Sequence, residues 1–140
     1  MQLNETTNAL LERRFGKDSL MALATCVDHL PFVRTVNACY RDGAFYVITY
    51  ALSGKMQQIA QNPCVALSGD WFTAQGTGEN LGYVGKPENA GTVQWLKEQF
   101  SAWIHNGHTD FEDENTVLLK IRLTSGILFA DGTRYAIDFP

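Results

Sequence analysis

Arg34, Lys55 and Ser53 are the residues of this chain best suited to bind an anion together. Arg34 lies in a stretch rich in β-branched and aromatic residues, typical of a strand, and strand alternation puts it on an otherwise apolar or aromatic face. A partly buried guanidinium without a partner costs several kcal/mol. Between residues 31 and 70 the one acidic side chain is Asp42. We therefore expect the partner of Arg34 to be a bound anion, and a phosphate suits it best.

A predicted β-hairpin carries Arg34. Asp42-Gly43 forms its two-residue turn, because both residue types tolerate the positive φ that such turns require. The first strand contains Arg34, and the return strand is Ala44–Tyr50. The register of this turn predicts Arg34 opposite Ala51, at the open end of the hairpin.

A short predicted helix follows the hairpin and carries Lys55. Ser53 is its N-cap, Gly54 and Lys55 open it, and Asn62-Pro63 ends it. The lysine, the Ser53 hydroxyl and the free N–H groups of the helix start are therefore expected beside Arg34. A solvated strand edge is the alternative interpretation of the same residues.

The rest of the chain predicts further strands and two further helices. The apolar periodicities and turn signals place them in this order: a helix at Asn4–Phe15, a strand buried on both faces at Leu20–Val27, strands at Cys64–Leu67 and Trp71–Val84 with glycine bulges, a helix from Pro87 to Asn106-Gly107, a strand at Val117–Leu123, a turn at Thr124–Gly126, and a hairpin of Ile127–Ala130 and Thr133–Phe139 around Asp131-Gly132. Strands dominate without βαβ alternation. The pattern predicts one mainly β domain over residues 1–140, an antiparallel barrel with flanking helices.

Composition restricts the classes of partner. A hydrophobic content of 45% with 19% charged residues is typical of a folded globular chain, and the net charge of −4 argues against a nucleic-acid partner. No apolar run approaches the roughly 20 residues of a membrane span, and no signal peptide is evident. The three cysteines show no Cys-x-x-Cys spacing, which argues against a disulfide framework or a zinc site. We expect a cytoplasmic protein without a membrane partner.

Side-chain catalysis has little support in the sequence. No Gly-x-Ser-x-Gly elbow, Ser/His/Asp set or pair of carboxylates in an apolar setting is present. His105 and His108 precede an acidic segment, but the helix before them is expected to end between them, so we predict no metal site. Trp71 and Phe72 are open to two interpretations, namely packing in a core or interface and contact with an aromatic ligand.

The central stretch resembles the pyridoxamine 5'-phosphate oxidase-like family of FMN-binding split barrels. The order and spacing of short motifs carry the resemblance, which is clearest over residues 20–85. These motifs are Arg34-Thr35-Val36-Asn37, Ile48-Thr49, Ser53-Gly54-Lys55 and Asn62-Pro63.

The resemblance implies a split β-barrel of the antiparallel Greek-key type that binds FMN, and a homodimer whose subunits share the flavin site. Arg34 and Lys55 would neutralise the phosphate, with hydrogen bonds from Ser53 and Gly54 at the helix start. The residues implied along the ring system are Thr35, Val36, Asn37, Ile48, Thr49 and Trp71. The flavin would carry the redox chemistry, so we expect an oxidoreductase or flavin reductase that uses NAD(P)H or a small-molecule substrate.

Two departures from the family argue against oxidation of vitamin B6. Cys39 stands where these oxidases carry a lysine for the substrate phosphate, and the C-terminal segment around Arg134 has no histidine. Two alternatives stay open: a split barrel that binds haem or a deazaflavin, and a barrel that binds a small ligand without catalysis.

Overall fold

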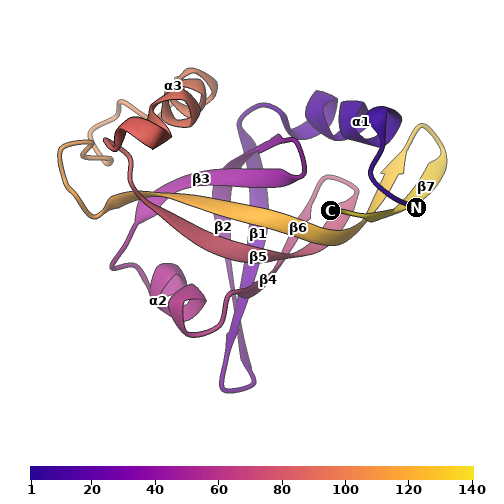
Figure 1. The fold of residues 1–140 in the computed structure, drawn as a ribbon, viewed down its shortest axis with the longest axis horizontal. Helices are drawn as coiled ribbons and strands as arrows, with labels where there is room; N and C mark the ends of the chain where they lie inside the picture. Colours follow the sequence, from indigo (N-terminus) through magenta and orange to yellow (C-terminus); the bar gives the residue numbers. More distant parts are fainter.

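In the computed structural model, which describes residues 1–140, the chain forms seven strands, three α-helices and one 3-10 helix (Figure 1). The helices are α1 (Glu5–Phe15), α2 (Gly54–Gln61) and α3 (Ala90–Gln99), and the 3-10 helix η1 (Pro87–Asn89) precedes α3. The strands are β1 (Ser19–Val27), β2 (Leu30–Arg41), β3 (Ala44–Tyr50), β4 (Cys64–Gly69), β5 (Phe72–Tyr83), β6 (Thr116–Ala130) and β7 (Thr133–Asp138).

Six of the strands close into an antiparallel barrel. The sheet order is β3-β2-β1-β4-β5-β6-β7, and an additional pairing of β3 with β6 closes the ring, which leaves β7 as an extension beside β6. Strands β1, β2 and β3 are consecutive neighbours, and β4 returns to lie beside β1, which is the Greek-key order. The expected split barrel of the antiparallel Greek-key type is therefore confirmed.

The barrel is split between β2 and β3. Their pairs run from Arg41 opposite Ala44 only as far as Cys39 opposite Tyr46, whereas β3 pairs along its whole length with β6. The expected turn is confirmed, but the expected placement of Arg34 opposite Ala51 is wrong. Beyond these three pairs β3 stays paired with β6 while β2 stays paired with β1, where Arg34 lies opposite Leu23. Arg34 therefore lies at the gap where the barrel opens.

Two hydrophobic clusters hold the fold together. The larger one, of 23 residues, fills the barrel and includes the packed rings of Phe15, Phe45 and Phe72. The smaller one lies between α3 and the outer face of the barrel, with α3 above β3 in the view of Figure 1. Its seven buried members are Cys39, Val84, Val93, Leu96, Phe100, Ile104 and Leu118. The apolar periodicity of this helix therefore marks the face that packs against the barrel.

The expected turn at Thr124–Gly126 is wrong, because β6 runs unbroken through it. Ser125 pairs with Gln75 and Leu123 with Gly76, so Thr124 is the extra residue of a β-bulge. The hydroxyls of Thr124 and Ser125 donate to the backbone and side chain of Gln75, which explains two polar residues inside a strand.

Two further expectations differ from the structure. Helix α3 ends at Gln99, short of the expected end, and separate turns continue to residue 106. Within these turns the Trp103 indole N–H donates to the Asp18 carboxylate at 3.0 Å. Strand β1 is buried on one face only, because no element covers the outer face, and Leu20 is 68% exposed there. None of the helices combines the length and the apolar composition of a membrane span.

Helix α2 is held in place by its N-cap and by close packing against β5. The Ser53 side chain accepts a hydrogen bond from the N–H of Met56, which confirms the expected N-cap. On β5 a side chain at Gly78 would lie 2.9 Å from Ile59, so only glycine permits this close approach of α2. The packing brings the first turn of α2 to the gap at Arg34.

Candidate functional site

The Arg34 guanidinium is held by neutral oxygen atoms alone. Its Nη1 donates to the Thr25 hydroxyl at 2.9 Å and to the Leu23 carbonyl at 3.4 Å, and its Nη2 donates to Oε1 of Gln58 at 2.5 Å. The structure contains three salt bridges, and none involves Arg34. The positive charge is thus positioned at the gap without being neutralised.

Lys55 joins Arg34 at the same gap. Its Nζ donates to the Thr49 hydroxyl at 2.6 Å, and no carboxylate contacts it. Burial, and after it the charge of Arg34, lower the pKa of Lys55, and burial also lowers the pKa of Arg34. Two partly desolvated cations that repel each other favour the binding of an anion between them.

The start of α2 faces this cation pair. Ser53 caps the helix, and Gly54 and Lys55 are its first two residues. The first N–H groups of a helix have no partner within the helix and favour negative charge. Positive charge from β2 and α2 and the N–H groups of the helix start therefore converge at one place, beside Thr49 of β3.

The motif on β2 divides between the two faces of the strand. Val36 lies on the face of Arg34 and is 6% exposed in the barrel core. Thr35 and Asn37 lie on the opposite face, where the Asn37 side chain donates to Asp18 at 2.9 Å. The side chain of Asn37 therefore supports the fold, and what it and Thr35 can offer at the gap is their backbone.

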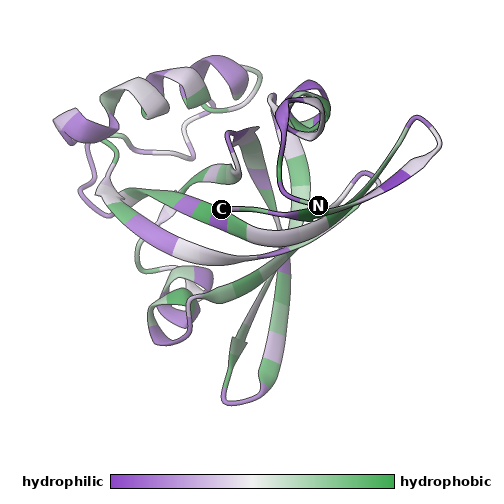
Figure 2. Cartoon of the chain, turned by 45° about the vertical axis from the view of Figure 1, so that its right-hand side comes forward, coloured by the Kyte–Doolittle hydropathy of each residue, from purple (hydrophilic) through white to green (hydrophobic).

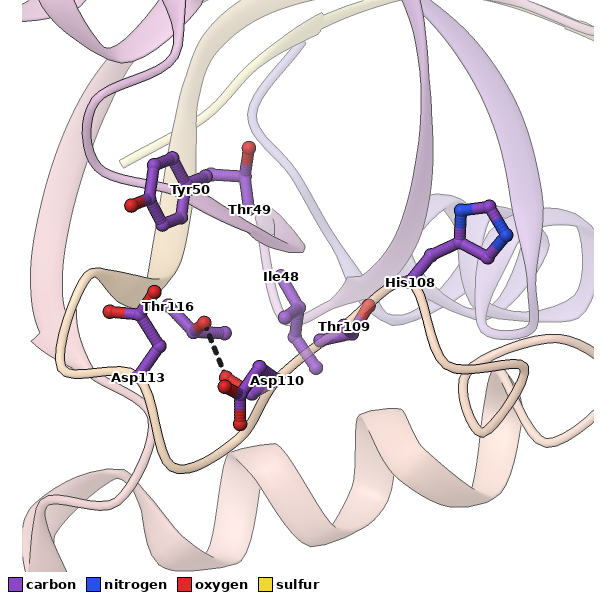
Figure 3. A pocket seen from close by; sticks show the side chains of 8 residues that line it. All are labelled: Ile48, Thr49, Tyr50, His108, Thr109, Asp110, Asp113 and Thr116. Atoms are coloured by element: carbon purple, nitrogen blue, oxygen red, sulfur yellow. Dashed lines mark hydrogen bonds between the residues drawn. The ribbon is translucent and has the colours of Figure 1, made fainter.

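Ile48 and Thr49 line a cavity of about 260 Å³ beside the gap (Figure 3). Its other walls come from the end of β3, the start of β6 and the segment before β6: Tyr50, Thr116, His108, Thr109, Asp110 and Asp113. The cavity therefore carries two carboxylates, which disfavour an anion inside it. The anion site is at Arg34 and Lys55, and the cavity suits a neutral group attached to that anion.

The histidine and acidic side chains of this region do not gather around one point. No group of three His, Cys, Asp or Glu side chains is arranged to hold an ion. The His108 ring points away from Asp110 and Asp113 (Figure 3). Each of these two aspartates accepts a hydrogen bond from a backbone N–H two residues on, so both carboxylates shape the loop.

Trp71 lies apart from the other expected cofactor residues within one protomer. It is 71% exposed in the turn before β5, with φ +52°, and its ring contacts Phe129 edge to face. Arg14 anchors this turn by donating to the carbonyls of Asp70 and Phe129. The contact of Trp71 with a flavin stays a prediction, and it requires a second subunit.

Two residues of the site carry no clear signal in the sequence. Thr25 in β1 and Gln58 in α2 both contact Arg34, but no motif in the residues next to them in the sequence marks either one. Helical spacing offers the only signal for Gln58, because it lies three residues after Lys55 and so on the same face of α2.

The sequence profile of the family described as pyridoxamine 5'-phosphate oxidase matches residues 4–128 of the chain. No curated protein sequence matches it significantly.

Solved structures share the fold at low sequence identity. An FAD-binding protein from Mesorhizobium loti superposes with a TM-score of 0.67 at 14% identity, covering 89% of this chain and 92% of its own. A heme-binding protein from Mycobacterium smegmatis superposes with a TM-score of 0.66 at 12% identity, covering 99% of this chain and 59% of its own. An F420 reductase superposes with a TM-score of 0.61 at 20% identity, covering 82% of this chain and 94% of its own. Proteins with this barrel therefore bind different cofactors.

Proposed function

The chain belongs to the pyridoxamine 5'-phosphate oxidase family, and we propose that it is an FMN-binding flavoprotein that acts as an oxidoreductase or flavin reductase. The observation that carries the proposal is the cation pair of Arg34 and Lys55, which has hydrogen-bond partners but no counter-ion. A phosphate monoester supplies the missing negative charge.

The proposed phosphate site consists of side chains and helix N–H groups. Arg34 and Lys55 neutralise the phosphate, and the Ser53 hydroxyl and the N–H groups at Gly54 and Lys55 add hydrogen bonds. Because the guanidinium and the ammonium already occupy fixed positions at Gln58 and Thr49, little ordering is needed when the ligand binds.

The ring system is proposed to extend from the gap along β2 and β3 toward the cavity beside Thr49. Thr49 faces it with its side chain, Val36 backs it from the barrel core, and Thr35, Asn37 and Ile48 border it with backbone groups. When bound, the flavin supplies the hydride and electron chemistry, and this chain binds and orients it. The carboxylates of the cavity favour a neutral or cationic substrate there over an anionic one.

FMN fits this chain better than FAD. The structure offers one compact cation pair, and the neighbouring cavity carries carboxylates that disfavour the second phosphate of a dinucleotide. The relative from Mesorhizobium loti is named as FAD-binding, so the choice is tested directly by identifying the nucleotide.

Vitamin B6 is not the proposed substrate. Cys39, which stands where the family's oxidases have a lysine for the substrate phosphate, is 0% exposed under α3. Burial, and after it the charge of Asp18, raise the pKa of this thiol to about 12, so it stays neutral. Residue 39 therefore cannot supply a cation to a second phosphate.

A homodimer completes the proposed site. One cavity of about 260 Å³ is smaller than the roughly 300–1,000 Å³ of sites that enclose such ligands. The β1–β2 hairpin extends from the barrel, with hydrophobic residues near its end (Figure 2), and Leu30, Phe32 and Val33 on it are exposed. This apolar hairpin leads directly to Arg34, so a second copy covering it would also cover the flavin. Phe72, which the sequence suggested for the interface, is 1% exposed and belongs to the core.

The test is an absorption spectrum of the purified protein after incubation with FMN, FAD, haem and F420 in separate samples. We expect saturable binding of FMN, with release of the mononucleotide on denaturation. Addition of NADH or NADPH under anaerobic conditions should then bleach the flavin. Tight binding of haem or F420 without affinity for FMN would overturn the proposal, and FMN binding without any reduction would favour a binding protein over an enzyme.

A further inference from the structure

Gln58, Thr25 and Arg34 form a closed ring of hydrogen bonds at the gap of the barrel. Arg34 donates to the Thr25 hydroxyl at 2.9 Å and to Oε1 of Gln58 at 2.5 Å, and the Thr25 hydroxyl donates to the same Oε1 at 2.6 Å. Thr25 is 2% exposed, so this ring is anchored in the protein interior. The ring fixes where the guanidinium points.

The acceptors of the ring carry no charge. Glutamate has nearly the same shape as glutamine and would form a charge-assisted pair with Arg34 at this distance. A carboxylate at position 58 would therefore hold the guanidinium at least as firmly, but it would cancel the charge that an anionic ligand needs. The amide provides orientation without neutralisation.

The orientation of the Gln58 amide also leaves a donor free. Arg34 has only N–H donors, so the amide oxygen must face it, and Nε2 lies on the other side. That nitrogen would be 3.9 Å from a side-chain carbon placed on Gly54, and no protein acceptor bonds it. The Gln58 amide therefore presents its NH₂ group beside the first residue of α2, where donors for the phosphate converge.

We propose that Gln58 is a positioning and selectivity residue of the anion site, which orients Arg34 through a neutral oxygen and so preserves the site's preference for a phosphate-bearing ligand. The inference rests on the proposed binding of FMN. It adds that the uncharged amide at position 58, beyond the presence of Arg34 and Lys55, sets the discrimination between FMN and the same ring system without a phosphate.

The decisive variant is Gln58→Glu, measured by fluorescence titration with FMN and with riboflavin. We expect FMN affinity to fall tenfold or more and riboflavin affinity to stay within twofold, because only the phosphate meets the neutralised arginine. The melting temperature of the ligand-free variant should be equal or higher, since the new carboxylate pairs with Arg34. Misfolding would instead lower the FMN affinity, the riboflavin affinity and the melting temperature together.

Two further variants control for charge and shape. Gln61→Glu makes the same change on the same helix, at an exposed residue without a side-chain hydrogen bond, and should leave FMN affinity within twofold. Gln58→Met removes the acceptor without adding charge, so it should weaken FMN binding less than Gln58→Glu. It also provides the test if the glutamate variant does not fold.

The outcomes separate this inference from the function on which it rests. A wild-type protein that does not bind FMN contradicts the proposed function. A wild-type protein that binds FMN, with Gln58→Glu binding it within twofold, overturns the role of Gln58 and leaves the function standing. Equal losses for FMN and riboflavin, or equal losses in the glutamate and methionine variants, also overturn it, because the effect would then be one of shape.

Discussion

The ammonium of Lys55 on α2 lies close enough to the guanidinium of Arg34 on β2 that the arginine's charge, together with burial, lowers the pKa of the lysine. The two residues are 21 positions apart in the chain, and the N-cap at Ser53 and the packing of α2 on Gly78 bring them together. Such a pair is unfavourable unless an anion binds, so the fold maintains a repulsion that a ligand relieves.

Removing either cation should weaken FMN binding without weakening the fold. A charge-assisted hydrogen bond contributes about 1.5–3 kcal/mol, so Arg34→Ala or Lys55→Met should reduce FMN affinity roughly ten- to a hundredfold. The ligand-free melting temperature should hold or rise, because the repulsion disappears. Titration calorimetry and thermal unfolding measure the two quantities.

Riboflavin provides the control for these variants. It lacks the phosphate, so it should bind the wild type weakly and respond little to either substitution. The double variant should lose less than the sum of the single losses, because both cations contact one ligand group. If riboflavin and FMN lose affinity equally, the phosphate is not at Arg34 and Lys55.

FMN affinity should fall with rising pH before the ordinary lysine pKa of 10.5 is reached. Burial and then Arg34 lower the pKa of Lys55 in the free protein, and a bound phosphate raises it again, so binding in this window requires uptake of a proton. The ratio of riboflavin to FMN dissociation constants isolates the effect, because both ligands share the ring's own ionisation. A Lys55→Arg variant keeps its charge through the window and should show a constant ratio, and a constant ratio in the wild type would contradict the assignment.

The barrel was predictable from the sequence because its signals are local. Asp42-Gly43 and Asp131-Gly132 adopt the positive φ values that their types predict, and the apolar alternation of β6 gives its buried face. The cap at Ser53 likewise follows from adjacent residues.

The misplaced features depend on distant contacts. Pairing of β3 with β6, 66 to 78 residues away in the chain, decides where the β2–β3 hairpin separates, and hence where Arg34 lies. The bulge at Thr124 depends on Gln75 in β5, which no local pattern shows. Thr25 and Gln58 were missed for the same reason, because their role exists only through Arg34.

The free energy of unfolding should decrease between about pH 9 and pH 12. Burial raises the pKa of Cys39 and of Tyr40 to about 12, from ordinary values of 9.0 and 10.0. In this window the unfolded chain releases protons that the folded chain retains, so the contribution of these groups is fully present below pH 9 and is lost as the pH rises toward 12. Urea unfolding at pH 7 to 11 measures the decline.

The variants Cys39→Ala and Tyr40→Phe check which groups cause the decline. Each should make the curve flatter, although Tyr40→Phe also lowers stability at every pH because its hydroxyl bonds Asn8 and Gly43. The lowered pKa of Lys55 acts in the opposite direction, so the comparison is between variants and wild type. Slopes that do not change in either variant would show that other groups titrate.

A single charge on the β1–β2 hairpin should dissociate the proposed dimer. Val33 is 70% exposed in one protomer, so Val33→Lys leaves the monomer fold intact, whereas a second copy on this hairpin would bury the ammonium without a partner. The free-energy cost of burying this charge should raise the dimer dissociation constant by at least about tenfold. Sedimentation velocity at micromolar concentration, with and without FMN, should show a wild-type dimer and a variant that is largely monomeric and binds FMN more weakly. A Val33→Lys variant that stays dimeric would move the interface away from this hairpin, and a wild-type monomer in the presence of FMN would contradict the shared flavin site itself.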